Sequence, residues 1–178
     1  MPGRLKPWGK VKMFLKNYTS NVPVSKTISR IEQVLIRCGI KGITKEYAGT
    51  SGEIVALTFR IVLDDGAPLE VRLPAHVNLA QDALWLDYIG DDLDGKGNVK
   101  WSSRKKLKRA DFKDQAARTA WKIAQEWIEI EMSRIQLKQA EKLEVFLPYV
   151  WDGKRTYFQS LKESKFAGLL PEKCEVVD

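Results

Sequence analysis

Apolar residues recur at steps of three and four between Asp111 and Leu147, a stretch that no proline or glycine interrupts before Pro148. Residues at this spacing share one face of a helix. Asp111, with Asp114 three residues later, is typical of a helix start, where a capping side chain and negative charge are favourable. The pattern predicts one long helix as the spine of the fold, with an apolar face formed by Ala117, Trp121, Ala124, Ile128, Met132 and Ile135 and widened by Ile123, Trp127 and Ile130.

Three stretches ahead of this helix alternate apolar and polar residues, which is the period of a half-buried strand. They are Ile43 to Tyr47, Glu53 to Leu63 and Leu69 to Leu73. Residues 49–52 and 64–68, which contain the glycines and aspartates typical of turns, separate them. Short connections of this kind join neighbouring antiparallel strands, so the sequence predicts a three-stranded antiparallel meander on which the long helix packs.

Two more helical patterns flank the strands. Ser25 is a typical N-cap for a helix that ends at Cys38 before Gly39, and Val77 to Ile89 forms the other. The predicted fold class is α+β: an N-terminal helix with a three-stranded antiparallel sheet, followed by two helices of which the last is long. We expect residues 1–17 to be a basic flexible arm, residues 18–153 a single α+β domain, and residues 154–178 a short helix and tail.

The composition is that of a globular protein. A chain of 178 residues with 44% hydrophobic residues is long enough for one domain with a core. Cys38 and Cys174 are far apart and belong to no metal-spaced cluster, which favours a reducing compartment. We find no apolar segment with the length of a signal peptide core or a membrane span. These features predict a soluble cytoplasmic protein.

Charge is unevenly distributed along the chain, whose net charge is +7. Residues 1–50 carry ten lysines and arginines against two acids, whereas residues 51–100 carry four against nine. Such segregation favours an anionic partner, nucleic acid above all. A solvated basic surface without a partner is the alternative, because it has the same composition.

The strongest functional signal is a basic run directly before the long helix. Nucleic-acid sites need cations for the phosphates, and single strands also need aromatic rings, each stacked base contributing about 1–3 kcal/mol. Trp151, in a predicted loop, is a further candidate for stacking. The alternative for the basic run, residues 104–109, is a solvated segment without a partner. The alternative for the basic N-terminal arm is an ordinary frayed terminus. The candidate nucleic-acid-binding residues are Lys100, Trp101, Arg104, Lys105, Lys106, Lys108 and Arg109, joined by Trp8, Lys10 and Lys12 in the arm.

Catalytic and metal-binding patterns are weak by comparison. Asp92 and Asp94 fit a calcium-binding loop only if Lys96 takes a ligand position, where a cation is unfavourable. Residues 70–72 with a nearby aspartate resemble a nuclease metal site but lack its lysine, and a turn explains the aspartates. His76, the only histidine, has no accompanying nucleophile. We therefore expect a protein that is not an enzyme and that uses no metal or cofactor.

Several short blocks occur in one order along the chain: Tyr18-Thr19, Val22-Pro23-Val24, Lys26-Thr27-Ile28, Ala56-Leu57-Thr58-Phe59, Arg72-Leu73-Pro74-Ala75, Arg118-Thr119-Ala120-Trp121 and Phe146-Leu147-Pro148-Tyr149. With them the chain resembles, over residues 18–153, a family of small uncharacterised proteins encoded in phages, prophages and other bacterial mobile elements. The resemblance implies a setting in the cytoplasm of a bacterial host and carries no catalytic residues. One departure is His76, where a small polar residue such as Asn is expected.

Taken together, these patterns predict a phage-type nucleic-acid-binding protein that holds single-stranded DNA or RNA by charge and aromatic stacking. The alternative is a protein-interaction module that inhibits or modulates a host enzyme or defence protein. A third hypothesis is self-association along an exposed strip of the long helix. The salt dependence of binding distinguishes the first two hypotheses. Contacts to phosphates weaken steeply as the salt concentration rises, whereas apolar contacts to a protein partner do not.

Overall fold

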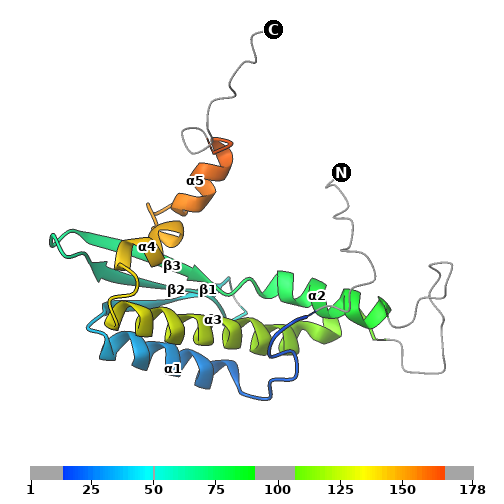
Figure 1. Ribbon diagram of the computed structural model, residues 1–178. Helices are drawn as coiled ribbons and strands as arrows, with labels where there is room; N and C mark the ends of the chain where they lie inside the picture. The colour runs from blue at the N-terminus through cyan, green and yellow to red at the C-terminus, as the bar shows by residue number, and fades with distance from the viewer. Residues whose placement is uncertain (1–13, 50, 91–106, 167–178) are drawn as a thin grey trace, which may run out of the picture. The chain divides into compact units, whose positions relative to one another are not determined.

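The computed structural model describes residues 14–49, 51–90 and 107–166 (Figure 1). By their internal contacts the described residues divide into two compact units. The helical unit takes its residues from 1–28 and 75–126, and the sheet unit takes its residues from 29–74 and 127–178. Two helices contribute to both units: α1 (Val24–Arg37) and α3 (Lys113–Gln136).

The sheet unit contains the predicted antiparallel meander. Its strands are β1 (Lys41–Ala48), β2 (Glu53–Val62) and β3 (Pro68–Pro74), and β2 lies between the other two. Gly66 has a φ of 86° in the turn between β2 and β3, a conformation that favours glycine. The helix, the three-stranded sheet and the later helices confirm the predicted α+β class.

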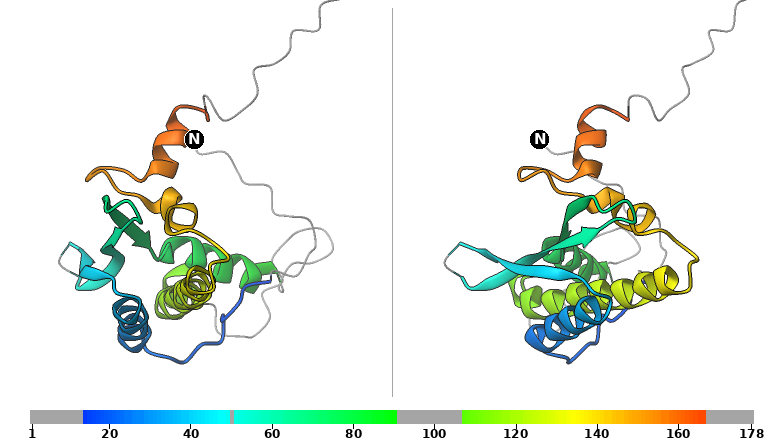
Figure 2. Two further views of the ribbon diagram at one scale, coloured as in Figure 1. Left: turned by 60° about the vertical axis from the view of Figure 1, so that its left-hand side comes forward. Right: turned by 90° about the vertical axis from the view of Figure 1, so that its left-hand side faces the viewer.

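One face of this sheet forms the core of its unit. Alternate residues of β2 point to the same face, and the odd-numbered ones from Leu57 to Ile61 are buried. Figures 1 and 2 show the parts of α1 and α3 that belong to this unit lying side by side along that face. Their apolar stripes complete the core, which includes Ile31, Leu35, Leu57, Phe59, Ile61, Val71, Ile128 and Met132.

The predicted helix from Asp111 to Leu147 is interrupted, and that expectation was wrong. A 3-10 helix, η1 (Arg109–Phe112), precedes α3, and α3 ends at Gln136. Lys138 then takes a φ of 56°, its N–H donates to Ile135 O, and the next N–H donates to Arg134 O at 2.9 Å. This pair of bonds is a Schellman motif, which normally carries glycine at the position that Lys138 occupies.

After this turn the chain forms α4 (Lys142–Phe146) and a 3-10 helix, η2 (Leu147–Tyr149). Phe146 is fully buried, and its ring meets those of Phe59 at 5.6 Å and Trp127 at 6.0 Å between centroids, both edge to face. Such aromatic pairs add to the energy of burial. The break in the long helix therefore returns the chain to the sheet and completes its core.

The second predicted row on the long helix is only partly buried. Ile123 is 37% exposed and Ile130 54% exposed, so neither widens the apolar face as expected. Trp121 and Ile128 of the first row are fully buried. The narrower stripe is the one that period 3.6 alone predicts.

The helical unit packs α2 (Val77–Gly90) and η1 with the first part of α3. Its buried residues include Ala80, Leu84, Ala116, Ala120 and Trp121, and the rings of Trp85, Tyr88 and Phe112 form an aromatic cluster.

Residues just before α1 lie against α3 in this unit. Lys16 pairs with Glu126 at 2.7 Å, and Thr119 donates its hydroxyl to Asn17 O. Gln115 donates to the carbonyl of Tyr18 at 2.6 Å. The predicted flexible arm, residues 1–17, thus reaches α3 at its last two residues, while residues 1–13 lie outside the described parts of the chain.

Candidate functional site

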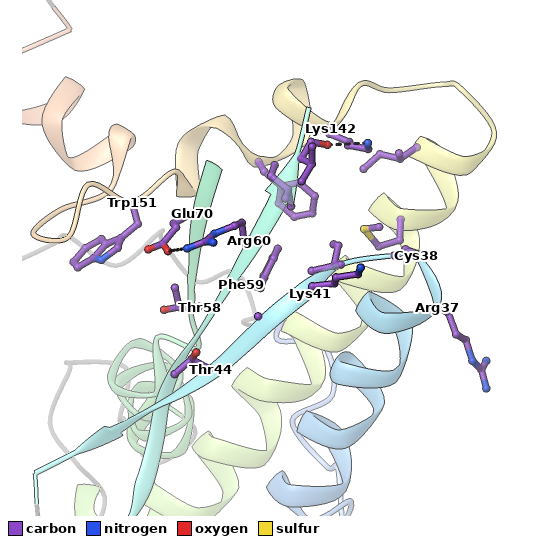
Figure 3. Close-up of a pocket in the computed structure, with 18 of the residues that line it drawn as sticks. Arg37, Cys38, Lys41, Thr44, Thr58, Phe59, Arg60, Glu70, Lys142 and Trp151 are labelled. Carbon is purple, nitrogen blue, oxygen red and sulfur yellow. Dashed lines mark hydrogen bonds and ion pairs between the residues drawn. The ribbon is translucent and has the colours of Figure 1, made fainter. Parts of the chain in front are cut away.

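A hollow of about 1260 Å³ lies in the sheet unit (Figure 3). It is lined by the end of α1, by β1 and β2, by the last turn of α3, by two residues of α4, and by single residues of β3 and the segment that follows η2. Two of its lining residues are acidic, Glu46 and Glu70. Five are cationic: Arg37, Lys41, Lys45, Arg60 and Lys142.

Part of this hollow is the sheet face opposite the core, which we call the outer face. Even-numbered residues of β2 from Ala56 to Val62 point to it, because side chains alternate along a strand. The register places Thr44, Thr58 and Arg72 opposite one another across the three strands. Figure 3 shows Thr44, Thr58 and Arg60 following one another along this face, with Glu70 beside them.

An arginine crosses the outer face from β3 to β1. Arg72 donates two hydrogen bonds to the Glu46 carboxylate, at 2.7 Å from Nε and 3.0 Å from Nη2. Since Glu46 lies opposite Ala56 on the central strand, the small side chain of Ala56 leaves room for this bridge. The hydrogen bond from Arg72 is the main reason that the pKa of Glu46 lies below its usual value, so Glu46 is ionised at neutral pH.

Trp151 lies against this arginine, with the Arg72 guanidinium 4.9 Å from the centroid of its ring. The backbone fixes its position, because the Trp151 N–H donates to Glu70 O at 2.8 Å and Val150 bridges to Val71. Residues 150–151 thus continue the sheet beyond β3. A cation over an indole ring is favourable, so the bridge and the tryptophan hold each other in place.

The turn after Trp151 is also held by hydrogen bonds. The Asp152 carboxylate accepts the N–H groups of Lys154 and Arg155, both at 2.8 Å. These backbone bonds, that of Arg155 first, keep the pKa of Asp152 below its usual value. Thr156 then caps α5 (Tyr157–Glu163), accepting from the Gln159 N–H.

The remaining cations of the hollow differ in how far they are neutralised. Arg60 pairs with Glu70 at 2.9 Å and Lys45 with Glu32 at 3.0 Å. Lys142 donates to Val62 O and also pairs with Asp64 at 3.5 Å. Within residues 14–49, 51–90 and 107–166, Arg37 and Lys41 have no ion-pair partner. Figure 3 shows Arg37 directed outward from the end of α1. An anion at the hollow therefore meets cations that no described carboxylate neutralises.

Most of the residues predicted from the sequence to bind nucleic acid lie outside the described parts of the chain. These are Trp8, Lys10, Lys12, Lys100, Trp101, Arg104, Lys105 and Lys106. Lys108 and Arg109 lie at the start of η1 in the helical unit, both exposed. Arg109 pairs with Asp82 at 2.5 Å and so is partly neutralised, and the Lys108 N–H donates to Asp111. Their role in binding stays a prediction.

Other chemistry weighed from the sequence takes structural positions. Asp65 accepts the Ala67 N–H in the turn after β2, and Glu70 and Arg72 belong to the ion pairs of the outer face. His76 is exposed with a φ of 51°, and its carbonyl accepts the first N–H bonds of α2. The described residues contain no group of three or more potential metal ligands. Asp92 and Asp94 lie outside them.

The bridge between Arg72 and Glu46 was missed in the sequence. Its residues are far apart along the chain, and the alternation within one strand does not show which residues of neighbouring strands lie close together. The position of Trp151 in a predicted loop is one sequence feature that points to this site. The small residue Ala56, on the strand between those that carry Glu46 and Arg72, is a second such feature.

No protein-family model, curated protein or solved structure matches this chain. The resemblance to proteins of phages and mobile elements therefore stays a prediction. Within the described residues no helix has both the length and the apolar character needed to cross a bilayer.

Proposed function

We propose that this protein binds single-stranded DNA or RNA at the hollow of the sheet unit, by charge and aromatic stacking. Five cations line the hollow, and the observation that carries the proposal is that two of them, Arg37 and Lys41, have no ion-pair partner among the described residues, with Trp151 at the border of the hollow. Cations hold the phosphates, and an aromatic ring beside them accepts an unpaired base.

The geometry suits a single strand. The outer face is an open sheet surface with hydroxyl and guanidinium groups on neighbouring strands, and Lys41 adds a charge that no described acid neutralises. Bases of a duplex are stacked on one another and are not accessible to Trp151. A single strand presents both phosphates and base faces, so it is the nucleic acid that can use charge and ring together.

The basic run at residues 104–109 and the arm at residues 1–17 supply further phosphate contacts in this proposal. Both are strongly basic in sequence, and Lys108 is exposed where the run meets the helical unit. The proposal includes the setting implied by the family resemblance, a phage or mobile element in the cytoplasm of a bacterial host. It also includes the absence of enzymatic activity and of a cofactor.

A protein-interaction module is the second candidate, and α5 is the observation in its favour. Tyr157 and Phe158 are 41% and 49% exposed on this short helix. Exposed aromatic side chains are enriched in protein interfaces. In this role the protein would bind a host enzyme or defence protein, and binding would tolerate salt.

Charge reversal at the hollow tests the leading proposal. Lys41→Glu places a negative charge where we propose a phosphate, so it is expected to weaken binding of a labelled oligothymidine by about tenfold. The measurement is fluorescence anisotropy with the full chain. Lys162→Glu, on the exposed side of α5, is the matched control because it changes the net charge equally without lining the hollow.

Loss of affinity in Lys41→Glu alone supports binding at the hollow. Equal losses in both variants would show a response to net charge only, which would contradict the proposed site. Loss confined instead to Lys108→Glu would assign binding to the basic run and leave the hollow without this role.

A further inference from the structure

Each arginine of the outer face is held by a glutamate from a neighbouring position on the same face. Arg72 of β3 binds the Glu46 carboxylate through two bonds, at 2.7 and 3.0 Å. Arg60 of β2 binds the Glu70 carboxylate at 2.9 Å. These two glutamates are also the acids that line the hollow. The same two carboxylates therefore limit how strongly the hollow attracts anions.

A carboxylate and a phosphate present the same feature to a guanidinium. Both offer two oxygens in a plane that matches the N–H groups of arginine, which is why arginine is common at either kind of site. A carboxylate that already occupies this position holds the arginine in the geometry that a phosphate requires.

We infer that Glu46 and Glu70 are internal substitutes for phosphate, and that phosphates of a bound strand replace them on Arg72 and Arg60. This inference rests on the proposed function and names its phosphate-binding residues. Because Arg72 lies against Trp151, a phosphate bound to Arg72 belongs to a nucleotide beside the indole ring. The glutamates position the arginines in the free protein and lower its affinity for phosphodiesters.

The exposure of the four side chains permits this exchange. Glu46 is 46% and Glu70 49% exposed, so each carboxylate can turn into solvent without a burial cost. Arg72 is only 18% exposed and is held by Trp151, so it stays in place when Glu46 leaves. An exposed ion pair alters an equilibrium by about two- to fivefold, a cost that one phosphate contact offsets.

The test measures binding of a labelled oligothymidine of about 15 nucleotides to the full chain by fluorescence anisotropy. Glu46→Gln and Glu70→Gln keep the side-chain shape and remove the competing charge. Each is expected to bind about two- to fivefold more tightly than the unaltered protein. Glu163→Gln is the matched control, because Glu163, the last residue of α5, pairs with Arg155 and does not line the hollow.

A double-mutant cycle separates this role from a general effect of charge. If Glu70 acts through Arg60, the gain from Glu70→Gln is lost when Arg60→Gln is already present. This pair suits the cycle because both side chains are about half exposed or more, so the variants are expected to fold. Unfolding midpoints in urea verify that they do.

The outcomes distinguish a failure of this inference from a failure of the proposed function. Tighter binding by the two hollow variants, abolished in the Arg60→Gln background, supports the exchange of glutamate for phosphate. Binding by the unaltered protein that these substitutions leave unchanged or weaken, or that Glu163→Gln strengthens equally, would overturn this inference alone. Absence of binding by every variant would overturn the proposed function and this inference with it.

Discussion

Arg72 shows how one side chain organises a surface. It leaves β3, passes over the central strand beside Ala56, and binds Glu46 on β1 while it lies against Trp151. Three strands and the segment after η2 are joined by this one residue. The cost of ordering a long side chain is shared between two partners, which favours a single arrangement of the outer face.

The pKa of Glu46 gives a prediction at this scale. Its value is lower in the folded protein than in the unfolded chain, chiefly because Arg72 donates hydrogen bonds to the carboxylate. The ion pair therefore stabilises the fold above the unfolded pKa, and this contribution is lost as pH falls through the folded pKa. Since Glu46 is nearly half exposed, Glu46→Gln is expected to cost less than about 1 kcal/mol near neutral pH.

Urea unfolding of the unaltered protein and of Glu46→Gln, followed between pH 7 and about pH 2.5, measures this contribution. The difference in free energy of unfolding is expected to shrink toward zero at the acid end. In the Arg72→Gln background it should be small at every pH. A difference that persists at the acid end would mean that Glu46 stabilises the fold by packing and not through its charge.

At the scale of elements, the regular spacing of apolar residues correctly predicted the strands and the helix α2. Alternation of apolar residues predicted all three strands, and the helix predicted at Val77 to Ile89 is α2, Val77–Gly90. The end of α3 was missed, because the usual sign is glycine and Lys138 takes its place. The candidate site was missed for a different reason. The contact of Arg72 with Glu46 depends on strand register, which the pattern of a single strand does not contain.

The turn after α3 gives a prediction at this scale. Lys138 has a left-handed φ of 56°, which costs a non-glycine residue about 1–2 kcal/mol. Lys138→Gly is expected to relieve most of this strain and to stabilise the fold by roughly 0.5–1 kcal/mol, measured by urea unfolding. Ser133→Gly, at an exposed position within α3, is the matched control and is expected to destabilise by roughly 0.5–1 kcal/mol. If Lys138→Gly also destabilised, the turn would not limit the stability of this region.

At the scale of the whole molecule, charge is the property that composition and structure share. The net charge of +7 is concentrated in sequence near the N-terminus and before α3, and the described structure adds a cationic hollow in the sheet unit. Five cations line that hollow although they come from α1, β1, β2 and α4. From its charge the sequence favours an anionic partner, which stays a prediction. It did not predict this surface, because the fold gathers cations that are scattered along the chain.

Binding of nucleic acid is the central claim, and a salt titration tests it most directly. The full chain is titrated into labelled oligothymidine and into a duplex of equal length at about 50 and 200 mM salt, while anisotropy and tryptophan fluorescence are followed. We predict tighter binding of the single strand, quenching of tryptophan, and a loss of affinity of tenfold or more between the two salt concentrations. Absence of binding at the lower salt concentration, or an affinity that does not change with salt, would contradict the proposed function and favour a protein partner.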